Sequence, residues 1–124
     1  MLPGSELKGE EAAPPADWSA LEAEETFQLE TRPEDPYSVN VWVVGIGSDA
    51  YVGTGADGTR WSDHVQADPH VRLRVGEAIY PLVAAAVTQH EERERVARAY
   101  VDKYGLDSDD NWVMDALVFR LDPR

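Results

Sequence analysis

The sequence predicts a mainly β domain in which short antiparallel strands form a small barrel with helical additions. Six short segments are rich in β-branched and apolar residues, and most are separated only by a turn, which favours hairpins. Helix signals between these segments occur at only two places. A chain of 124 residues, 43% of them apolar, is long enough for one domain with a sizeable core.

The N-terminal segment differs in composition from the rest of the chain. Residues 1–16 contain proline, glycine and acidic residues and very little to bury, so we predict a disordered acidic leader there. The barrel domain is then expected to span residues 17–124. Asp17 is suited to cap a short helix in which Trp18 and Leu21, three residues apart, share one face.

The six predicted strands differ in their patterns. The first alternates in polarity, and the second is apolar on both faces, as a central strand would be, so Trp42 within it is expected to pack. Turn residues at Ser48 and Gly76 predict hairpins of the second strand with the third and of the fourth with the fifth. Pro81 cannot donate to a ladder, so we expect the fifth strand to be an edge strand or bulged. The predicted strands cover residues 26–32, 38–44, 50–54, 71–75, 78–87 and 116–121.

Two helices are predicted between the strands. The first covers residues 59–67 and ends there because the residue before Pro69 disfavours α geometry. The second begins at a capping box formed by Thr88 and Glu91, and it ends before Gly105. Its inward-facing stripe is expected to consist of Val96, Tyr100 and Tyr104.

Charge and composition exclude several classes of function. The 24 acidic residues outnumber the 11 Lys and Arg, and residues 1–35 alone carry a net charge of −8, which leaves −5 for the remainder. This balance argues against nucleic acid and against anionic membranes as partners. No cysteine is present, so disulfides, thiolate catalysis and Cys-ligated metals are excluded. No stretch approaches the roughly 18 apolar residues of a membrane span, and a cytoplasmic location is expected.

Two glycine-rich segments follow predicted strands. The segment from Gly45 to Ala50 imitates a dinucleotide fingerprint, but no helix follows it, so we interpret it as a hairpin end. The segment from Gly53 does lead into a helix, at Thr59. Here the hydroxyls of Thr54 and Thr59, together with Arg60, could form a phosphate cradle at the helix N-terminus, the alternative being a flexible loop with a helix cap.

Other candidate groups have simpler interpretations. Arg72 and Arg74 share the outer face of one strand, where they could meet an anionic ligand, although pairing with acidic side chains is favoured. Trp61 could flank a planar ring beside the glycine loop, but it more plausibly anchors the helix to the barrel.

No metal site is predicted. His64, His70 and His90 are scattered without the spacing of metal ligands. Residues 107–111 begin like a calcium loop, but Trp112 and Val118 stand where that loop requires glycine and glutamate.

Several short motifs follow one another in a distinctive order. They are Tyr51-Val-Gly-Thr54, Thr59-Arg60, Ala67-Asp-Pro69-His-Val71, Val71-Arg-Leu-Arg-Val-Gly76 and Thr88-x-x-Glu-Glu-Arg. The first three resemble the FMN-binding split barrel of pyridoxamine 5′-phosphate oxidase-like proteins. Those proteins carry an aromatic-x-Thr strand end, Ser-Arg/Lys and a helix closing in Ala-Asn-Pro. The last two are closer to the deazaflavin-dependent nitroreductase-like branch and a related family of small bacterial split-barrel domains. The likeness covers about residues 17–124.

This resemblance implies a six-stranded antiparallel split barrel with Greek-key character and two to three short helices. It further implies a homodimer that holds a flavin-type cofactor, FMN or alternatively deazaflavin F420, in a groove between subunits and acts on a small molecule. Carried over by position, Thr54, Thr59 and Arg60 would hold the cofactor phosphate, and Trp61 and Arg72 would lie at the cofactor. The chain departs from the FMN-binding pattern at positions 40 and 42, where Asn and Trp replace a basic pair.

Two functions are therefore weighed. The first is a flavin-binding split barrel with oxidoreductase activity, in which the cofactor performs the redox chemistry. The second is a cofactor-free barrel that acts as a small-ligand or protein-binding module, since a fold does not determine a function. No residue stands out as an essential acid or base, so no catalytic residue is nominated.

Overall fold

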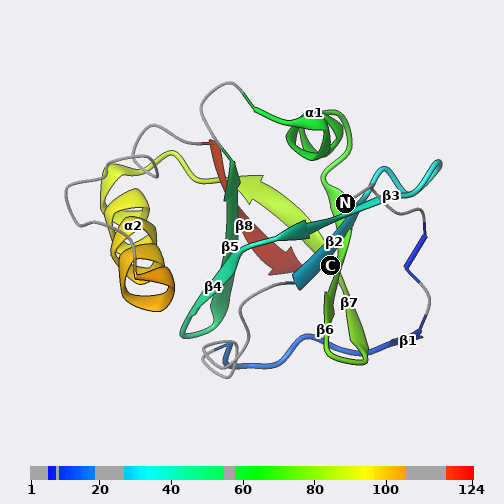
Figure 1. Ribbon diagram of the computed structural model, residues 1–124, viewed down its shortest axis with the longest axis horizontal. Coiled ribbons are helices and arrows are strands. Elements are labelled where there is room, and N and C mark those ends of the chain that lie inside the picture. The colour runs from blue at the N-terminus through cyan, green and yellow to red at the C-terminus, as the bar shows by residue number, and fades with distance from the viewer. Residues whose placement is uncertain (1–5, 8, 19–26, 55–57, 106–116) are drawn as a thin grey trace.

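The computed structural model describes residues 6–7, 9–18, 27–54, 58–105 and 117–124. Within these residues the chain forms eight strands and two helices arranged as a curved, mainly antiparallel sheet (Figure 1). The predicted mainly β class is confirmed, but the predicted number of six strands is wrong. The elements are β1 (Glu10–Glu11), β2 (Phe27–Thr31), β3 (Tyr37–Val41), β4 (Val43–Ile46), β5 (Asp49–Thr54), α1 (Arg60–Ala67), β6 (His70–Val75), β7 (Ala78–Ala86), α2 (His90–Tyr104) and β8 (Leu117–Pro123).

One extra strand arises because the segment predicted as a single strand over residues 38–44 is divided at Trp42. β3 pairs with β2, whereas β4 pairs with β5, so the predicted hairpin is confirmed only for the second half. The sheet order is β3-β2-β6-β7-β8-β5-β4, which places β3 and β4 at opposite ends of the path. Because one residue joins them, the sheet must curve until its two ends meet at Trp42.

Side chains of α2 explain the division. The Trp42 carbonyl accepts a hydrogen bond from the Tyr100 hydroxyl at 2.9 Å. The Tyr104 hydroxyl accepts from the Val43 N–H at 3.1 Å and donates to the Val43 carbonyl at 3.0 Å. These hydroxyls satisfy backbone groups that leave the ladder at the corner. Trp42 itself is 47% exposed and stacks on Tyr104, so the prediction that it packs in the core is wrong.

Two hydrophobic clusters hold the elements together. The larger one fills the barrel and includes Leu29, Leu73 and Phe119, with α1 contributing Trp61 and Val65. The smaller one lies between α2 and the outer face of β4, β5 and β8, and Figure 1 shows α2 lying alongside these strands. The predicted inward stripe of α2 is confirmed: Val96 and Tyr100 are buried in this cluster and Tyr104 packs against it.

Described residues of the N-terminal segment, for which a disordered leader is predicted, contact the sheet. β1 pairs in parallel with β7, and the Ala12 N–H donates to the Ile79 carbonyl at 2.8 Å. Leu7 is buried. A strand of acidic residues was not predicted because its partner lies almost 70 residues away in the chain.

Pro81 explains why β1 can occupy that position. β7 lies between β6 and β8 and pairs with β6 in continuous register through Pro81, so the predicted edge or bulge is wrong. Backbone groups alternate in direction along a strand, so the Pro81 nitrogen faces the same side as the Ile79 carbonyl. On that side of β7, pairing with β8 begins only at Leu82. Pro81, which has no N–H to donate, therefore lies between the part of β7 that pairs with β1 and the part that pairs with β8.

The helix boundaries agree with the sequence except at one cap. Thr59 caps α1 as predicted, and Gly105 ends α2 in the left-handed region at φ 64°. The predicted capping box of Thr88 and Glu91 is wrong, because α2 begins at His90 and Gln89 is its N-cap. Val87 still donates to the Val118 carbonyl in the sheet, which places the helix start beyond Thr88. The helix predicted after Asp17 and the calcium-like segment 107–111 lie outside the described residues.

The hairpin interpretation of Gly45 and Gly47 is confirmed. A Cβ at Gly45 would lie 2.3 Å from the Trp18 carbonyl oxygen, and Gly47 has a φ of +56°. The Trp18 N–H donates to the Gly47 carbonyl at 2.7 Å, so the glycines admit the chain before β2 to this turn. Neither helix in the described residues is long and apolar enough to cross a membrane.

Candidate functional site

The predicted phosphate cradle lies where β5 passes into α1. β5 ends at Thr54, which is buried, and α1 begins after its N-cap Thr59. The Thr59 N–H donates to Ser62 Oγ at 2.8 Å, and the Ser62 N–H donates to Thr59 Oγ1 at 3.4 Å. This reciprocal cap fixes the first turn of the helix. Residues 55–57 of the glycine loop lie outside the described residues.

Gly58 fits this turn for a steric reason. Its φ is +80°, and a Cβ there would lie 3.0 Å from Ser62 Oγ, so a side chain would meet the capping hydroxyl. The first two side chains of α1 differ in exposure. Arg60 is exposed, whereas Trp61 is buried and packs edge-on against Phe119 with the ring centroids 5.9 Å apart. Trp61 therefore anchors α1 to the barrel, which is the interpretation that the sequence favoured.

Arg72 lies elsewhere. Its guanidinium forms a bidentate ion pair with Glu30 on the neighbouring strand, at 2.8 and 2.7 Å, and also donates to the Leu7 carbonyl. The Leu7 N–H donates to the same carboxylate at 2.7 Å. Burial raises the pKa of Glu30, but these hydrogen bonds and the charge of Arg72 outweigh it and hold that pKa below its ordinary value. Arg72 therefore pairs with an acidic side chain, which is the interpretation that the sequence favoured.

The ion pair also places Arg72 away from α1. Successive side chains of a strand point to opposite faces of the sheet, so Glu30 and Thr31 face opposite ways. Thr31 faces the helix side, where its hydroxyl bonds His64 of α1. The structure thus places Thr59 and Arg60 at the start of α1 and Thr54 at the end of β5, and it leaves Arg72 on the other face of the sheet.

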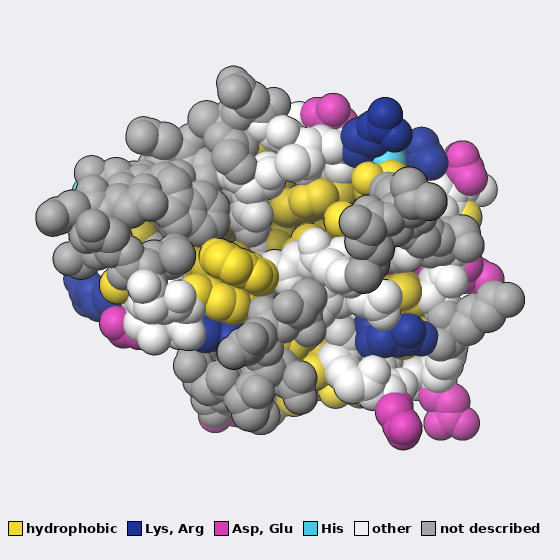
Figure 2. Space-filling view, viewed as in Figure 1, with side chains coloured by type: hydrophobic (Ala, Val, Ile, Leu, Met, Phe, Trp, Pro, Cys, Tyr) yellow, Lys and Arg dark blue, Asp and Glu magenta, His cyan; other side chains and the backbone are white. Residues whose placement is uncertain are grey.

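A basic cluster not foreseen from the sequence lies beside the first half of α1; it consists of Arg32, Arg60 and His64. Arg60 and His64 are four residues apart and share one helix face. His64 Nδ1 lies 2.9 Å from Thr31 Oγ1, and Arg32 follows Thr31 directly. In Figure 2, basic side chains gather around a histidine near the edge of the molecular face that is drawn. The i,i+4 spacing of Arg60 and His64 was the available sequence signal, but the approach of Arg32 is a tertiary contact.

The charged groups of this cluster influence the proton affinity of His64. Burial lowers the pKa of His64, and the positive charges of Arg32 and Arg60 lower it further. Asp63 and Asp35 act in the opposite direction but do not reverse the result. The arrangement combines two arginines with a partly exposed imidazole whose pKa is lowered, which suits it to meet an anion.

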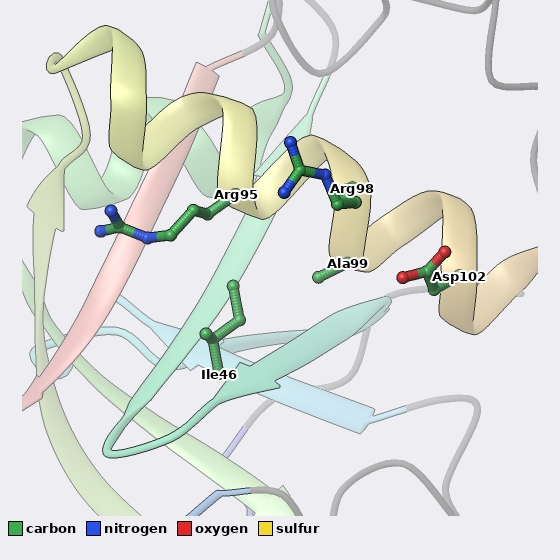
Figure 3. Close-up of a pocket in the computed structure, with 5 residues that line it drawn as sticks. All are labelled: Ile46, Arg95, Arg98, Ala99 and Asp102. Carbon is green, nitrogen blue, oxygen red and sulfur yellow. The ribbon is translucent and has the colours of Figure 1, made fainter.

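A concavity lies between α2 and β4. It encloses about 220 Å³ and is lined by Ile46, Arg95, Arg98, Ala99 and Asp102. Figure 3 shows the two guanidinium groups pointing in different directions above Ile46, so they do not converge on one ligand atom. The groove is open, and its charges are mixed, which makes it a weaker candidate than the end of α1.

A polar network beside this groove has a structural role. The Tyr51 hydroxyl donates to Glu92 at 2.7 Å, and Arg120 bonds both Glu92 and Asp122. The network joins α2 to β5 and β8. Burial and the neighbouring carboxylate raise the pKa of Tyr51, so the phenol stays protonated. Among the described residues no group of three acidic or histidine side chains could hold a metal ion.

Comparison with known proteins establishes the class of fold. The sequence matches no family model and no curated protein. Solved structures do match, and they identify the fold as the split barrel of pyridoxamine 5′-phosphate oxidase-like proteins, as the sequence motifs suggested.

Three neighbours illustrate the class. A candidate pyridoxamine 5′-phosphate oxidase from Listeria innocua matches with a TM-score of 0.66 and 16% identity, over 84% of this chain and 87% of that one. An F420-H2 dependent reductase matches with a TM-score of 0.65 and 15% identity, over 94% of this chain and 100% of its own. The heme storage protein HutZ from Vibrio cholerae matches with a TM-score of 0.65 and 19% identity, over 85% and 86% of the two chains. At these identities the likeness concerns the fold.

Proposed function

We propose that this protein binds a flavin-type cofactor, FMN in the first instance and deazaflavin F420 as the alternative, with the cofactor phosphate at the start of α1. The observation that supports the proposal is that, in a split barrel, β5 ends at Thr54 and α1 begins with exposed Arg60 after its N-cap Thr59. An anion at a helix N-terminus is favoured by free N–H groups and by the helix dipole.

The local residues fit a phosphate better than the net charge suggests. The whole chain carries −13, yet the basic cluster places Arg32 and His64 beside Arg60. Gly58 keeps the turn free of a side chain. Arg72 is left out of the proposed site, because a ligand would have to compete with the buried Glu30 for its guanidinium.

The names of the structural neighbours support a redox cofactor but do not identify which one this chain would bind. One is named as an F420-H2 dependent reductase and one as a candidate pyridoxamine 5′-phosphate oxidase, but another is named as a heme storage protein. A phosphate cradle favours a cofactor that carries a phosphate group. FMN, when bound, supplies two-electron chemistry, and this chain would bind and orient it. We further propose a homodimer acting on a small molecule, a proposal supported by a neighbour described as a domain-swapped dimer.

The test uses the full chain with FMN and with riboflavin, which lacks the phosphate. FMN at about 100 times its dissociation constant should add roughly 2.7 kcal/mol of stability, or roughly 10 °C in Tm for a domain of this size. Riboflavin should add less. Arg60→Ala should weaken FMN binding, and Arg98→Ala, a matched exposed arginine on α2, should not.

Absence of flavin absorbance in the purified protein, together with no change in Tm on adding FMN or F420, would contradict the proposal and favour a cofactor-free binding module. Equal effects of FMN and riboflavin would contradict the phosphate cradle alone.

A further inference from the structure

Of the two ring nitrogens of His64, Nδ1 is the one that is used within the described part of the chain. Nδ1 lies 2.9 Å from Thr31 Oγ1, and the Thr31 hydroxyl itself donates to the Tyr37 carbonyl in a long hydrogen bond of 3.5 Å. We assign Nδ1–H as the donor to this hydroxyl, a tautomer in which Nε2 is the unprotonated nitrogen of the neutral ring. The described part of the chain holds no hydrogen bond to Nε2. Tyr37 also packs edge-on against the ring at 4.9 Å, which fixes its orientation.

Four charged groups face this imidazole from the elements around it. Arg60 and Asp63 belong to α1, and Arg32 and Asp35 belong to the turn that follows β2. Arg32 is partly neutralised by Asp35, at 3.3 Å. Burial, followed by the net influence of these four charges, lowers the pKa of His64 below its ordinary value and so favours the neutral ring near neutral pH.

We propose that His64 is a proton-linked anion ligand: it is neutral in the free protein and takes up one proton at Nε2 when a phosphate-type dianion binds between it, Arg60 and Arg32. The proton comes from the solvent and no bond other than N–H is formed. This inference rests on the proposed function in that the cofactor phosphate is the expected dianion, and it adds a regulatory property: binding becomes tighter as the pH falls.

The physical basis is reciprocal linkage. A dianion beside the two arginines offsets the charges that now oppose protonation of His64, and it attracts the imidazolium. An opposite charge within about 4–6 Å changes the proton affinity of a titratable group by roughly tenfold or more. By linkage, protonation must change the affinity for the anion by the same factor. Nε2–H then becomes a hydrogen-bond donor to the ligand, a role that the neutral ring cannot perform with this nitrogen.

The first experiment follows the ring Cε1–H resonances of the three histidines by NMR between pH 5 and pH 8.5. The probe is sodium sulfate, which remains a dianion over this range, compared with sodium chloride at equal ionic strength because salt alone screens the arginines. The His64 resonance, assigned by its loss in His64→Gln, should titrate at a higher pH in sulfate. The resonances of His70 and His90, which are paired with Asp68 and Glu94 outside the basic cluster, serve as internal controls for a general effect of sulfate.

The second experiment measures FMN binding by calorimetry near pH 7 in buffers of different ionisation enthalpy. The wild-type protein should take up a substantial fraction of one proton in excess of any taken up by the FMN phosphate, whose second pKa is about 6. His64→Gln should lose that excess uptake, while His90→Gln should keep it. The affinity of the wild-type protein for sulfate should be roughly tenfold higher at pH 5.5 than at pH 8, and that of His64→Gln should not vary.

The outcomes separate the two proposals. FMN binding without excess proton uptake, or an unchanged His64 titration in sulfate, would overturn the role of His64 and leave the flavin proposal intact. A shifted His64 titration in sulfate without any FMN binding would support the anion site and contradict the flavin proposal. If neither FMN nor sulfate binds at any pH, both proposals are wrong.

Discussion

The buried ion pair between Arg72 and Glu30 makes a strong prediction about stability and its pH dependence. The Glu30 side chain is 5% exposed and that of Arg72 is 16% exposed, so solvent can do little to replace either partner. In Arg72→Met the Glu30 carboxylate loses both guanidinium hydrogen bonds and keeps the Leu7 N–H. Removing one partner of a buried pair typically costs about 3–5 kcal/mol, and we expect about 3 kcal/mol at pH 7.5 because Arg72 reaches towards the surface.

The pH dependence follows from the direction of the pKa changes. In the wild-type protein the pKa of Glu30 lies below its ordinary value, so its stabilising contribution is present at neutral pH and is lost as the pH falls through that lowered pKa. In Arg72→Met burial dominates and the pKa of Glu30 rises above its unfolded value. The penalty is then present above the raised pKa and disappears as the carboxyl is protonated. The difference between the two proteins should therefore shrink below about pH 5.

Urea denaturation of both proteins at pH 7.5 and pH 4.5 measures this difference. Glu30→Gln combined with Arg72→Met should recover part of the lost stability at pH 7.5, because no buried charge remains. Arg98→Met, which replaces an exposed arginine, should change the free energy of unfolding by less than about 0.5 kcal/mol. An equal loss of stability at both pH values in Arg72→Met would refute the electrostatic reasoning and indicate loss of packing by the arginine stem.

Three further predictions concern the hairpin, the corner and the assembly. Gly45→Ala should lower stability by about 2 kcal/mol or more in thermal denaturation, because its Cβ would lie 2.3 Å from the Trp18 carbonyl oxygen; an unchanged Tm would contradict that close approach. Tyr104→Phe should cost about 1–2 kcal/mol in urea denaturation, because the Val43 N–H loses its acceptor; a neutral effect would mean that water replaces the hydroxyl. Sedimentation should give a species of twice the 13.8 kDa chain mass, and a monomer at working concentration would contradict the proposed homodimer.

Local patterns predicted the elements whose causes lie within a few neighbouring residues. The α1 cap at Thr59 depends on Ser62, three residues later, and the end of α2 depends on the left-handed conformation of Gly105. The β6–β7 hairpin follows from the alternating strand before Gly76, the turn at Gly76 and the apolar segment after it. The stripe of α2 was predictable because apolar side chains at helical spacing must face a common surface.

The candidate site was predicted only in part. The glycine segment, Thr59 and Arg60 are contiguous in the chain, so their spacing indicated a phosphate cradle from the sequence. His64 and Arg32 join Arg60 because the end of β2 meets α1 through the bond between Thr31 and His64, across 33 residues. Arg72 was assigned to the cofactor by position, but its cross-strand partner Glu30 could not be known before the register of β2 and β6 was known.

The sequence by itself therefore determined the fold class, most of the strands and helices, and the place where β5 gives way to α1, since each depends on periodicity, capping or turn chemistry over short spans. The tertiary structure alone decided where the sheet closes, what the acidic N-terminal segment does and which charges surround the candidate site. Tyr100 and Tyr104 stabilise the corner at Trp42 from about 60 residues away, and Leu7 docks on a pair formed by Glu30 and Arg72. Such contacts satisfy buried polar groups with partners that only the folded chain brings into reach.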